Sequence, residues 1–181
     1  AAKKVLCQSS KHKEVLEKNL EISNVESLSF SLWSDEQLDF LRNVDTTKNG
    51  KAFIMKDPNP IKGLHKAEEY CKKNNIEYDL VDKLPYKQFI ETLAKYEKFV
   101  FFPTSLESFS RVILEARMLD CKLLTNNLNG CTYEEWFKKY KGKELINLVQ
   151  SQRQSVAGRI LDYLFKHEET KDGDITVILN C

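Results

Sequence analysis

Glycine and proline are scarce in this sequence of 181 residues, at six and four positions. Their scarcity excludes collagen-like, linker-like and low-complexity chains. An excess of one charge is also missing, since 28 Lys and Arg face 27 Asp and Glu. A balance this even gives no electrostatic case for binding nucleic acid or an anionic membrane. With 41% hydrophobic and 30% charged residues, the composition is that of a soluble globular protein.

Long apolar runs and clustered metal ligands are missing as well. No stretch approaches the ~18–20 apolar residues of a membrane-spanning helix, and the first ten residues lack the apolar core of a signal peptide. The cysteines are odd in number, scattered and without a C-x-x-C pair, which favours reduced thiols in a cytoplasmic protein. A cytoplasmic protein that is peripheral at a membrane face is also compatible with this pattern. The histidines are too far apart to favour a zinc site, so we predict no metal. These residues are Cys7, Cys71, Cys121, Cys131, Cys181, His12, His65 and His167.

What the sequence does contain is an alternation of short β-type runs and helical patterns. Runs rich in β-branched and aromatic residues predict strands over residues 51–56, 77–81, 98–102 and 122–125. Apolar residues at helical spacing predict helices over residues 63–75, from Pro85 onward and from Ser108–Phe109 onward. The alternation predicts an α/β fold, a Rossmann-like parallel sheet with helices on both faces. Its ligand crevice is expected at the carboxyl ends of the strands.

Residues 1–45 differ from this middle part. Val5–Cys7 predicts a strand, Ser9 or Ser10 a helix cap, and Ser34 the start of a second helix. The polar run DTTKNG then separates this segment from the next one.

Residues 50–167 form the predicted main domain. Its last part, from Tyr133, is expected to be mostly helical, with breaks or close contacts at Gly142 and Gly158. Residues 168–181 are expected to be a polar linker and a terminal strand, which either joins the same sheet or begins a further domain.

The stretch from Phe99 to Asn127 is the most informative for chemistry. An apolar strand ends at Pro103, a polar loop leads to Glu107, and the following helix carries Glu115 eight positions later. The first amides of a helix are unpaired donors at the positive end of its dipole, so this helix start can seat a phosphate. Glu107 can accept hydrogen bonds from sugar hydroxyls, and Glu115, if it faces the crevice, from a ribose diol.

This stretch resembles the E-x7-E motif of retaining GT-B glycosyltransferases of group one, the family related to glycogen and sucrose synthases. A basic residue at the end of a strand and a Lys-Gly pair that opens a helix complete the pattern upstream. The matching residues are Pro103 to Ser110, Glu115-Ala116, Asp120 to Leu124, Lys56 and Lys62-Gly63. The resemblance covers about residues 50 to 165.

The resemblance implies the donor-binding, carboxyl-terminal half of an enzyme that transfers a sugar from a nucleotide diphosphate sugar to a hydroxyl acceptor. Its implied catalytic residues are Glu107, for the hydroxyls of the donor sugar, and Lys62, for the diphosphate. The implied donor-binding residues are Lys56 and the segment Ser108, Phe109, Ser110 and Arg111 at the phosphates, Glu115 at the ribose, and Leu84 and Pro85 at the base. No metal is implied, because fixed cations and a helix start would balance the diphosphate, and no cofactor is implied, because the nucleotide sugar is the substrate.

Some residues depart from the family pattern and leave alternatives open. Ser108 and Ser110, which can also cap the helix, replace two glycines, Lys56 replaces an arginine, and Asp120-Cys121-Lys122 replaces the usual Gly-x-Pro. The resemblance makes residues 1–45 the tail of a preceding amino-terminal GT-B half, which supplies the acceptor site and is largely absent, so we expect a fragment of a longer polypeptide that is inactive alone. The alternatives are a non-catalytic nucleotide-sugar-binding or scaffold module, and another doubly wound domain such as a flavodoxin-like signalling domain.

Four of the candidate site residues also have a purely structural interpretation. Glu107 can be an acid at a helix start, and Glu115 an exposed helix residue. Lys62 can be an ordinary solvated lysine, and Arg111 an exposed helix arginine.

Overall fold

The apolar runs build the larger of two parallel sheets. In the computed structural model, which describes residues 4–165 and 176–177, four strands pair in the order β4-β3-β5-β6. Their bounds are β3 Ala52–Met55, β4 Tyr78–Val81, β5 Lys98–Phe101 and β6 Lys122–Thr125. Every pair is parallel, with Ala52 beside both Tyr78 and Lys98. The four predicted strands and their parallel pairing are confirmed.

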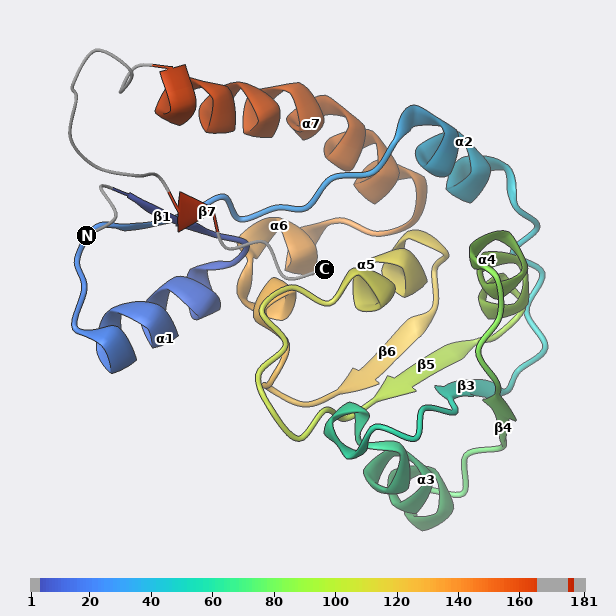
Figure 1. Ribbon diagram of the computed structural model, residues 1–181. Coiled ribbons are helices and arrows are strands. Elements are labelled where there is room, and N and C mark those ends of the chain that lie inside the picture. Colours follow the sequence, from blue (N-terminus) through green and yellow to red (C-terminus); the bar gives the residue numbers. More distant parts are fainter. Residues whose placement is uncertain (1–3, 166–175, 178–181) are drawn as a thin grey trace.

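Helices cover both faces of this sheet, as strands that are apolar on both sides require. The helices are α3 Leu64–Lys73, α4 Tyr86–Ala94 and α5 Arg111–Met118. Helix α3 packs against Ile54 and Val100 on one face. On the other face, α4 and α5 enclose Phe53 and Phe99. Figure 1 shows this layering, with α3 opposite α4 and α5. The predicted α/β class is confirmed at the level of a Rossmann-like parallel sheet.

A smaller parallel sheet, with the order β2-β1-β7, involves both ends of the chain. Its strands are β1 Val5–Cys7, β2 Val25–Ser27 and β7 Thr176–Val177, and α1 Ser10–Leu20 joins β1 to β2. Strand β1 and the cap of α1 by Ser9 are as predicted, because the Ser9 side chain accepts the His12 amide. Strand β7, the described part of the predicted terminal strand, pairs with β1 and not with the larger sheet. The predicted linker over 168–174 lies outside the described residues.

Helices α2 and α7 connect the two sheets. Helix α2, Asp35–Asn43, begins after Ser34 as predicted, with a capping box to Gln37. Helix α7, Gly142–Phe165, packs on α2 and α5 and runs across to the smaller sheet (Figure 1). One hydrophobic core therefore includes Trp33 and Leu38 together with side chains of the larger sheet. The remaining elements are the 3-10 helices η1 Pro60–Lys62 and η2 Gly130–Tyr133 and the short helix α6 Glu135–Lys139.

The two glycines near the end of the main domain behave differently. Gly142 has a φ of +52° at the start of α7 and a Cβ there would lie 2.6 Å from Asp120 Oδ2, which confirms the predicted close contact. Gly158 lies inside the continuous helix α7 with open space where a Cβ would be. The predicted break at Gly158 is wrong, because the helix packing outweighs the helix-weakening effect of one glycine.

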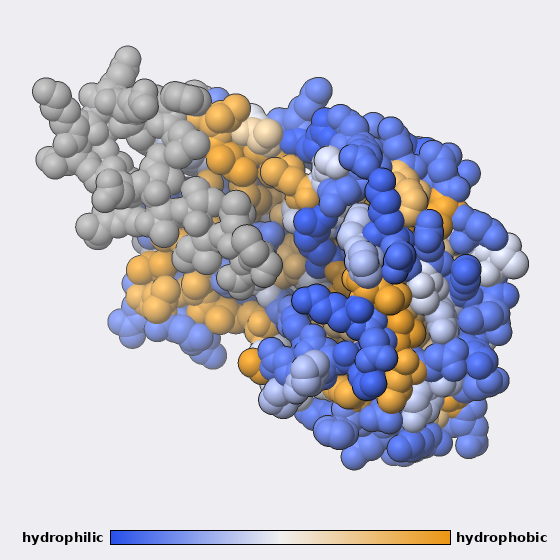
Figure 2. All heavy atoms as spheres, turned by 45° about the vertical axis from the view of Figure 1, so that its right-hand side comes forward, coloured by the Kyte–Doolittle hydropathy of each residue, from blue (hydrophilic) through white to orange (hydrophobic). Residues whose placement is uncertain are grey.

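On the face shown in Figure 2, polar side chains cover most of the part of the molecule that contains the larger sheet. Hydrophobic side chains reach the surface there in a narrow strip. Large hydrophobic side chains that are exposed include Ile61 and Leu80. Among the described residues, no helix combines the length and the apolar character needed to cross a membrane.

Candidate functional site

A cavity of about 580 Å³ opens at the carboxyl ends of β3 and β4, between α4 and α5. Ligands bind at this end of the strands in open α/β sheets, and the volume suits a small molecule. We call this cavity the α4–α5 pocket. Its lining residues are Met55, Lys56, Asp57, Pro58, Asp82, Lys83, Leu84, Tyr86, Phe89, Val112 and Glu115.

Glu115 is the buried acid of this pocket, with 5% of its surface exposed. Its Oε1 accepts hydrogen bonds from Trp33 Nε1 at 2.9 Å and from the Tyr86 hydroxyl at 3.1 Å. Arg111 Nη2 lies 3.8 Å from the same oxygen. Burial raises the pKa of Glu115, while these three neighbours act in the opposite direction. The interpretation of Glu115 as an exposed helix residue is therefore wrong.

Trp33 is a residue of the site that the sequence did not reveal. It lies between β2 and α2, is 2% exposed, and reaches Glu115 across 82 positions of sequence. The Arg111 guanidinium lies over its ring, 4.6 Å from the centroid. Arg111 is exposed as its structural interpretation predicts, but it also contacts the site. Only long-range packing identifies Trp33, because no motif surrounds it.

Glu107 and Lys62, the two implied catalytic residues, lie side by side. Lys62 Nζ is 2.8 Å from Glu107 Oε1, and both side chains are less than one third exposed. Lys62 ends η1, and the loop that leads to Glu107 is tied to η1 by the Thr104 amide, which donates to Ile61 O at 2.9 Å. The backbone of Glu107 pairs with the strand-like residue Asn129. The pair is a partly buried ion pair, so Lys62 is not an ordinary solvated lysine.

Gly63 lets the Lys62 loop approach the end of β5. Its φ is +70°, and a Cβ at this position would lie only 1.8 Å from the carbonyl oxygen of Phe102. Glycine alone combines that backbone conformation with so close an approach. The close approach to Phe102 thus explains why a glycine follows Lys62 in this sequence.

The start of α5 is covered in this structure. The helix begins at Arg111, later than the predicted Ser108–Phe109, and Ser110 occupies the N-cap position without a capping hydrogen bond from its side chain. Ser108, Phe109 and Ser110 are buried, and Ser9 Oγ donates to Ser108 O at 2.6 Å. The loop after β1 therefore lies on the segment that was predicted to seat phosphate.

The other predicted residues lie around the same edge of the sheet. Lys56 is exposed on the rim of the α4–α5 pocket, where its Nζ is 3.0 Å from Asp82 Oδ1. Leu84 lines this pocket, whereas Pro85 lines a neighbouring cavity of about 620 Å³ between α2 and α4. Lys62 and Glu107 do not line the α4–α5 pocket.

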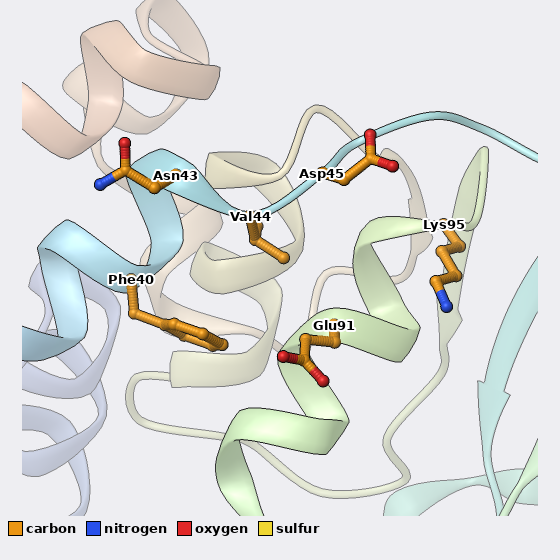
Figure 3. Close-up of a pocket in the computed structure, with 6 residues that line it drawn as sticks. All are labelled: Phe40, Asn43, Val44, Asp45, Glu91 and Lys95. Carbon is orange, nitrogen blue, oxygen red and sulfur yellow. The ribbon is translucent and has the colours of Figure 1, made fainter.

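A third cavity, of about 450 Å³, lies further along the groove between α2 and α4. In Figure 3, Phe40 and Val44 point toward α4, which carries Glu91 and is followed by Lys95, while Asn43 points away. No residue proposed from the sequence lines this cavity.

The described cysteines Cys7, Cys71, Cys121 and Cys131 are free and buried, and Cys181 lies outside the described residues. Within residues 4–165 and 176–177, no cluster of His, Cys, Asp and Glu has the arrangement of a metal site.

A scan against protein-family models and a search of curated proteins find no match to the chain.

Proposed function

We propose that the chain binds a nucleotide diphosphate sugar, as the donor-binding half of a retaining glycosyltransferase of the GT-B type. The ribose would contact Glu115, and the base would lie near Leu84. Lys62 and Lys56 would balance the diphosphate, and Glu107 would accept hydrogen bonds from the sugar. A further part of a longer polypeptide would hold the hydroxyl acceptor, so this chain is expected to be inactive alone.

The observation that carries the proposal is the placement of Glu115. A buried carboxylate is costly unless hydrogen bonds compensate for lost water. Here Trp33 and Tyr86 supply two donors to Oε1, and the residue lines a pocket at the carboxyl ends of parallel strands. A ligand with two adjacent hydroxyls suits such an acceptor.

The Lys62–Glu107 ion pair supports the same assignment. A diphosphate carries more negative charge than one carboxylate and forms strong charge-assisted hydrogen bonds with a lysine. Binding would draw Lys62 toward the phosphates and leave Glu107 free to accept from sugar hydroxyls. Because the two groups are 2.8 Å apart, a single ligand can contact both.

The test is calorimetry with UDP, GDP, ADP and CMP on the wild-type chain and two variants. Glu115→Gln keeps an oxygen for Trp33 and replaces the other carboxylate oxygen with an amide group. Lys62→Ala removes the implied phosphate ligand, and Lys72→Ala, at the exposed end of α3, is the matched control. We expect one nucleotide to bind, with weaker binding in Glu115→Gln and Lys62→Ala only. Absence of binding by all four nucleotides would overturn the proposal.

A non-catalytic nucleotide-sugar-binding or scaffold module is the second candidate. The observation that favours it is the covered start of α5, where Ser9 contacts Ser108 and the segment is buried. The two candidates differ in catalysis, because both can bind a nucleotide sugar. Sugar transfer by the longer polypeptide, lost in Glu107→Gln, would support the donor-binding half. Binding of the nucleotide sugar without turnover by that polypeptide would favour the non-catalytic module.

A further inference from the structure

The hydrogen bond from Trp33 joins Glu115 to a part of the chain outside the larger sheet. Trp33 precedes α2, whereas Tyr86 belongs to α4 and Glu115 to α5. Both Trp33 and Tyr86 donate to the same oxygen, Oε1. A rotation of the carboxylate would break both bonds, so the two donors together fix its orientation.

The remaining acceptor capacity of this carboxylate is available to a ligand. An ionised carboxylate offers about four acceptor positions on two oxygens. Because Trp33 and Tyr86 engage Oε1, the second oxygen is the acceptor that a ligand in the α4–α5 pocket can use. Its direction depends on the two donors that hold Oε1.

Trp33 is itself held by contacts to its backbone and to its ring. Arg153 of α7 donates from Nη1 to Trp33 O at 3.4 Å and forms an ion pair with Asp35 at 2.7 Å. On the ring, the Arg111 guanidinium stacks at 4.6 Å. These contacts anchor both the backbone and the ring, so the indole N–H has little freedom to turn away from Glu115.

We propose that Trp33 is a positioning residue for ribose recognition, whose indole N–H orients the Glu115 carboxylate toward the two ribose hydroxyls. This inference rests on the proposed function. It adds that nucleotide affinity depends on the segment before α2, which lies outside the four-stranded sheet.

The test compares Trp33→Phe with the wild-type chain by calorimetry. Phenylalanine keeps an aromatic ring for Arg111 but removes the N–H donor together with part of the buried indole, so a ligand without the ribose diol is needed to separate the lost hydrogen bond from altered packing. The first ligand is the nucleotide among UDP, GDP, ADP and CMP that binds most tightly to the wild-type chain. The second ligand is the 2′,3′-dideoxy analogue of that nucleotide. We expect the ribonucleotide to bind about ten- to a hundredfold more weakly to Trp33→Phe, as the loss of one hydrogen bond to a charged group implies. The dideoxy analogue, which has no ribose diol, should bind both proteins equally.

Trp136→Phe is the matched control. Trp136 Nε1 donates to Ser29 O at 3.1 Å, in the same segment as Trp33 but away from Glu115. The control therefore removes one indole hydrogen bond that secures this segment. We expect it to leave the affinities for both ligands close to those of the wild-type chain.

The pH dependence of binding gives a second readout. The groups that face the Glu115 carboxyl are Arg111 and Tyr86, with Lys56, Asp57, Asp82 and Lys83 elsewhere on the pocket wall. All of them are unchanged in Trp33→Phe. Loss of the donor favours protonation of Glu115, so ribonucleotide binding by Trp33→Phe should weaken at a higher pH than binding by the wild-type chain.

The outcomes separate this inference from the proposed function. If no nucleotide binds the wild-type chain, or if Glu115→Gln binds as well as wild type, the proposed function fails and the inference fails with it. If binding depends on Glu115 but Trp33→Phe is unchanged, only the role of Trp33 is refuted. It is also refuted if Trp33→Phe weakens the ribonucleotide and its dideoxy analogue equally, because a structural defect would do that.

Discussion

Replacing Gly63 with alanine should destabilise the protein far more than the same change at Gly50. Both glycines have positive φ, +70° and +80°, where an L-residue costs about 1–2 kcal/mol. At Gly63 a Cβ would lie 1.8 Å from Phe102 O and 2.6 Å from Phe102 C, whereas nothing lies within 4 Å at Gly50. The backbone must shift to relieve that clash, at a further ~1–3 kcal/mol. We expect Gly63→Ala to lose about 2–5 kcal/mol in total.

The assay is urea denaturation of both variants and the wild-type chain, with the free energy of unfolding extrapolated to water. Gly50→Ala measures the conformational strain, so the difference between the two variants measures the clash with the end of β5. Equal losses in the two variants would refute the steric argument for the Lys62-Gly63 pair.

The remaining predictions concern Glu26 and Gly158. Burial tends to raise the pKa of Glu26, but hydrogen bonds from Tyr163, Arg159 and Lys4 outweigh it and lower the pKa to about 2. The stability that Glu26 contributes is therefore complete above its ordinary pKa of 4.5 and is lost as the pH falls from there toward 2. The difference in unfolding free energy between wild type and Glu26→Gln should shrink over that range, and a constant difference would contradict the ionic role. Gly158→Ala should stabilise α7 by about 0.5–1 kcal/mol, because the position is helical and open, and a lower melting temperature would contradict this.

Local patterns were sufficient to predict the larger sheet. The strand at Lys98–Phe101 is almost purely apolar, and a strand of this kind must be buried on both faces. Capping chemistry likewise located the start of α2 at Ser34. Strand β2 was missed because Val25–Ser27 has a single apolar residue, and pairing with β1 rather than its own pattern makes it a strand.

The candidate site was only partly predictable. The E-x7-E spacing located Glu107 and Glu115, but not the direction in which either side chain points. The partners of these residues come from distant positions: Trp33 reaches Glu115, and Lys62 reaches Glu107. The cover over Ser108 comes from a loop that is 99 positions away in the sequence, which no local pattern can reveal.

Helix α7 has a consequence for how the molecule unfolds. Arg153 ties it to the Trp33 carbonyl and to Asp35 at the start of α2, and Arg159 ties it to β2 through Glu26 and the Ser27 carbonyl. It also packs on α2 and on α5, the helix that covers the larger sheet. Separating the two sheets would therefore break salt bridges and core packing at the same time. The amide protons of β2 and β5 should then exchange with solvent through a common opening event, as members of one cooperative folding unit.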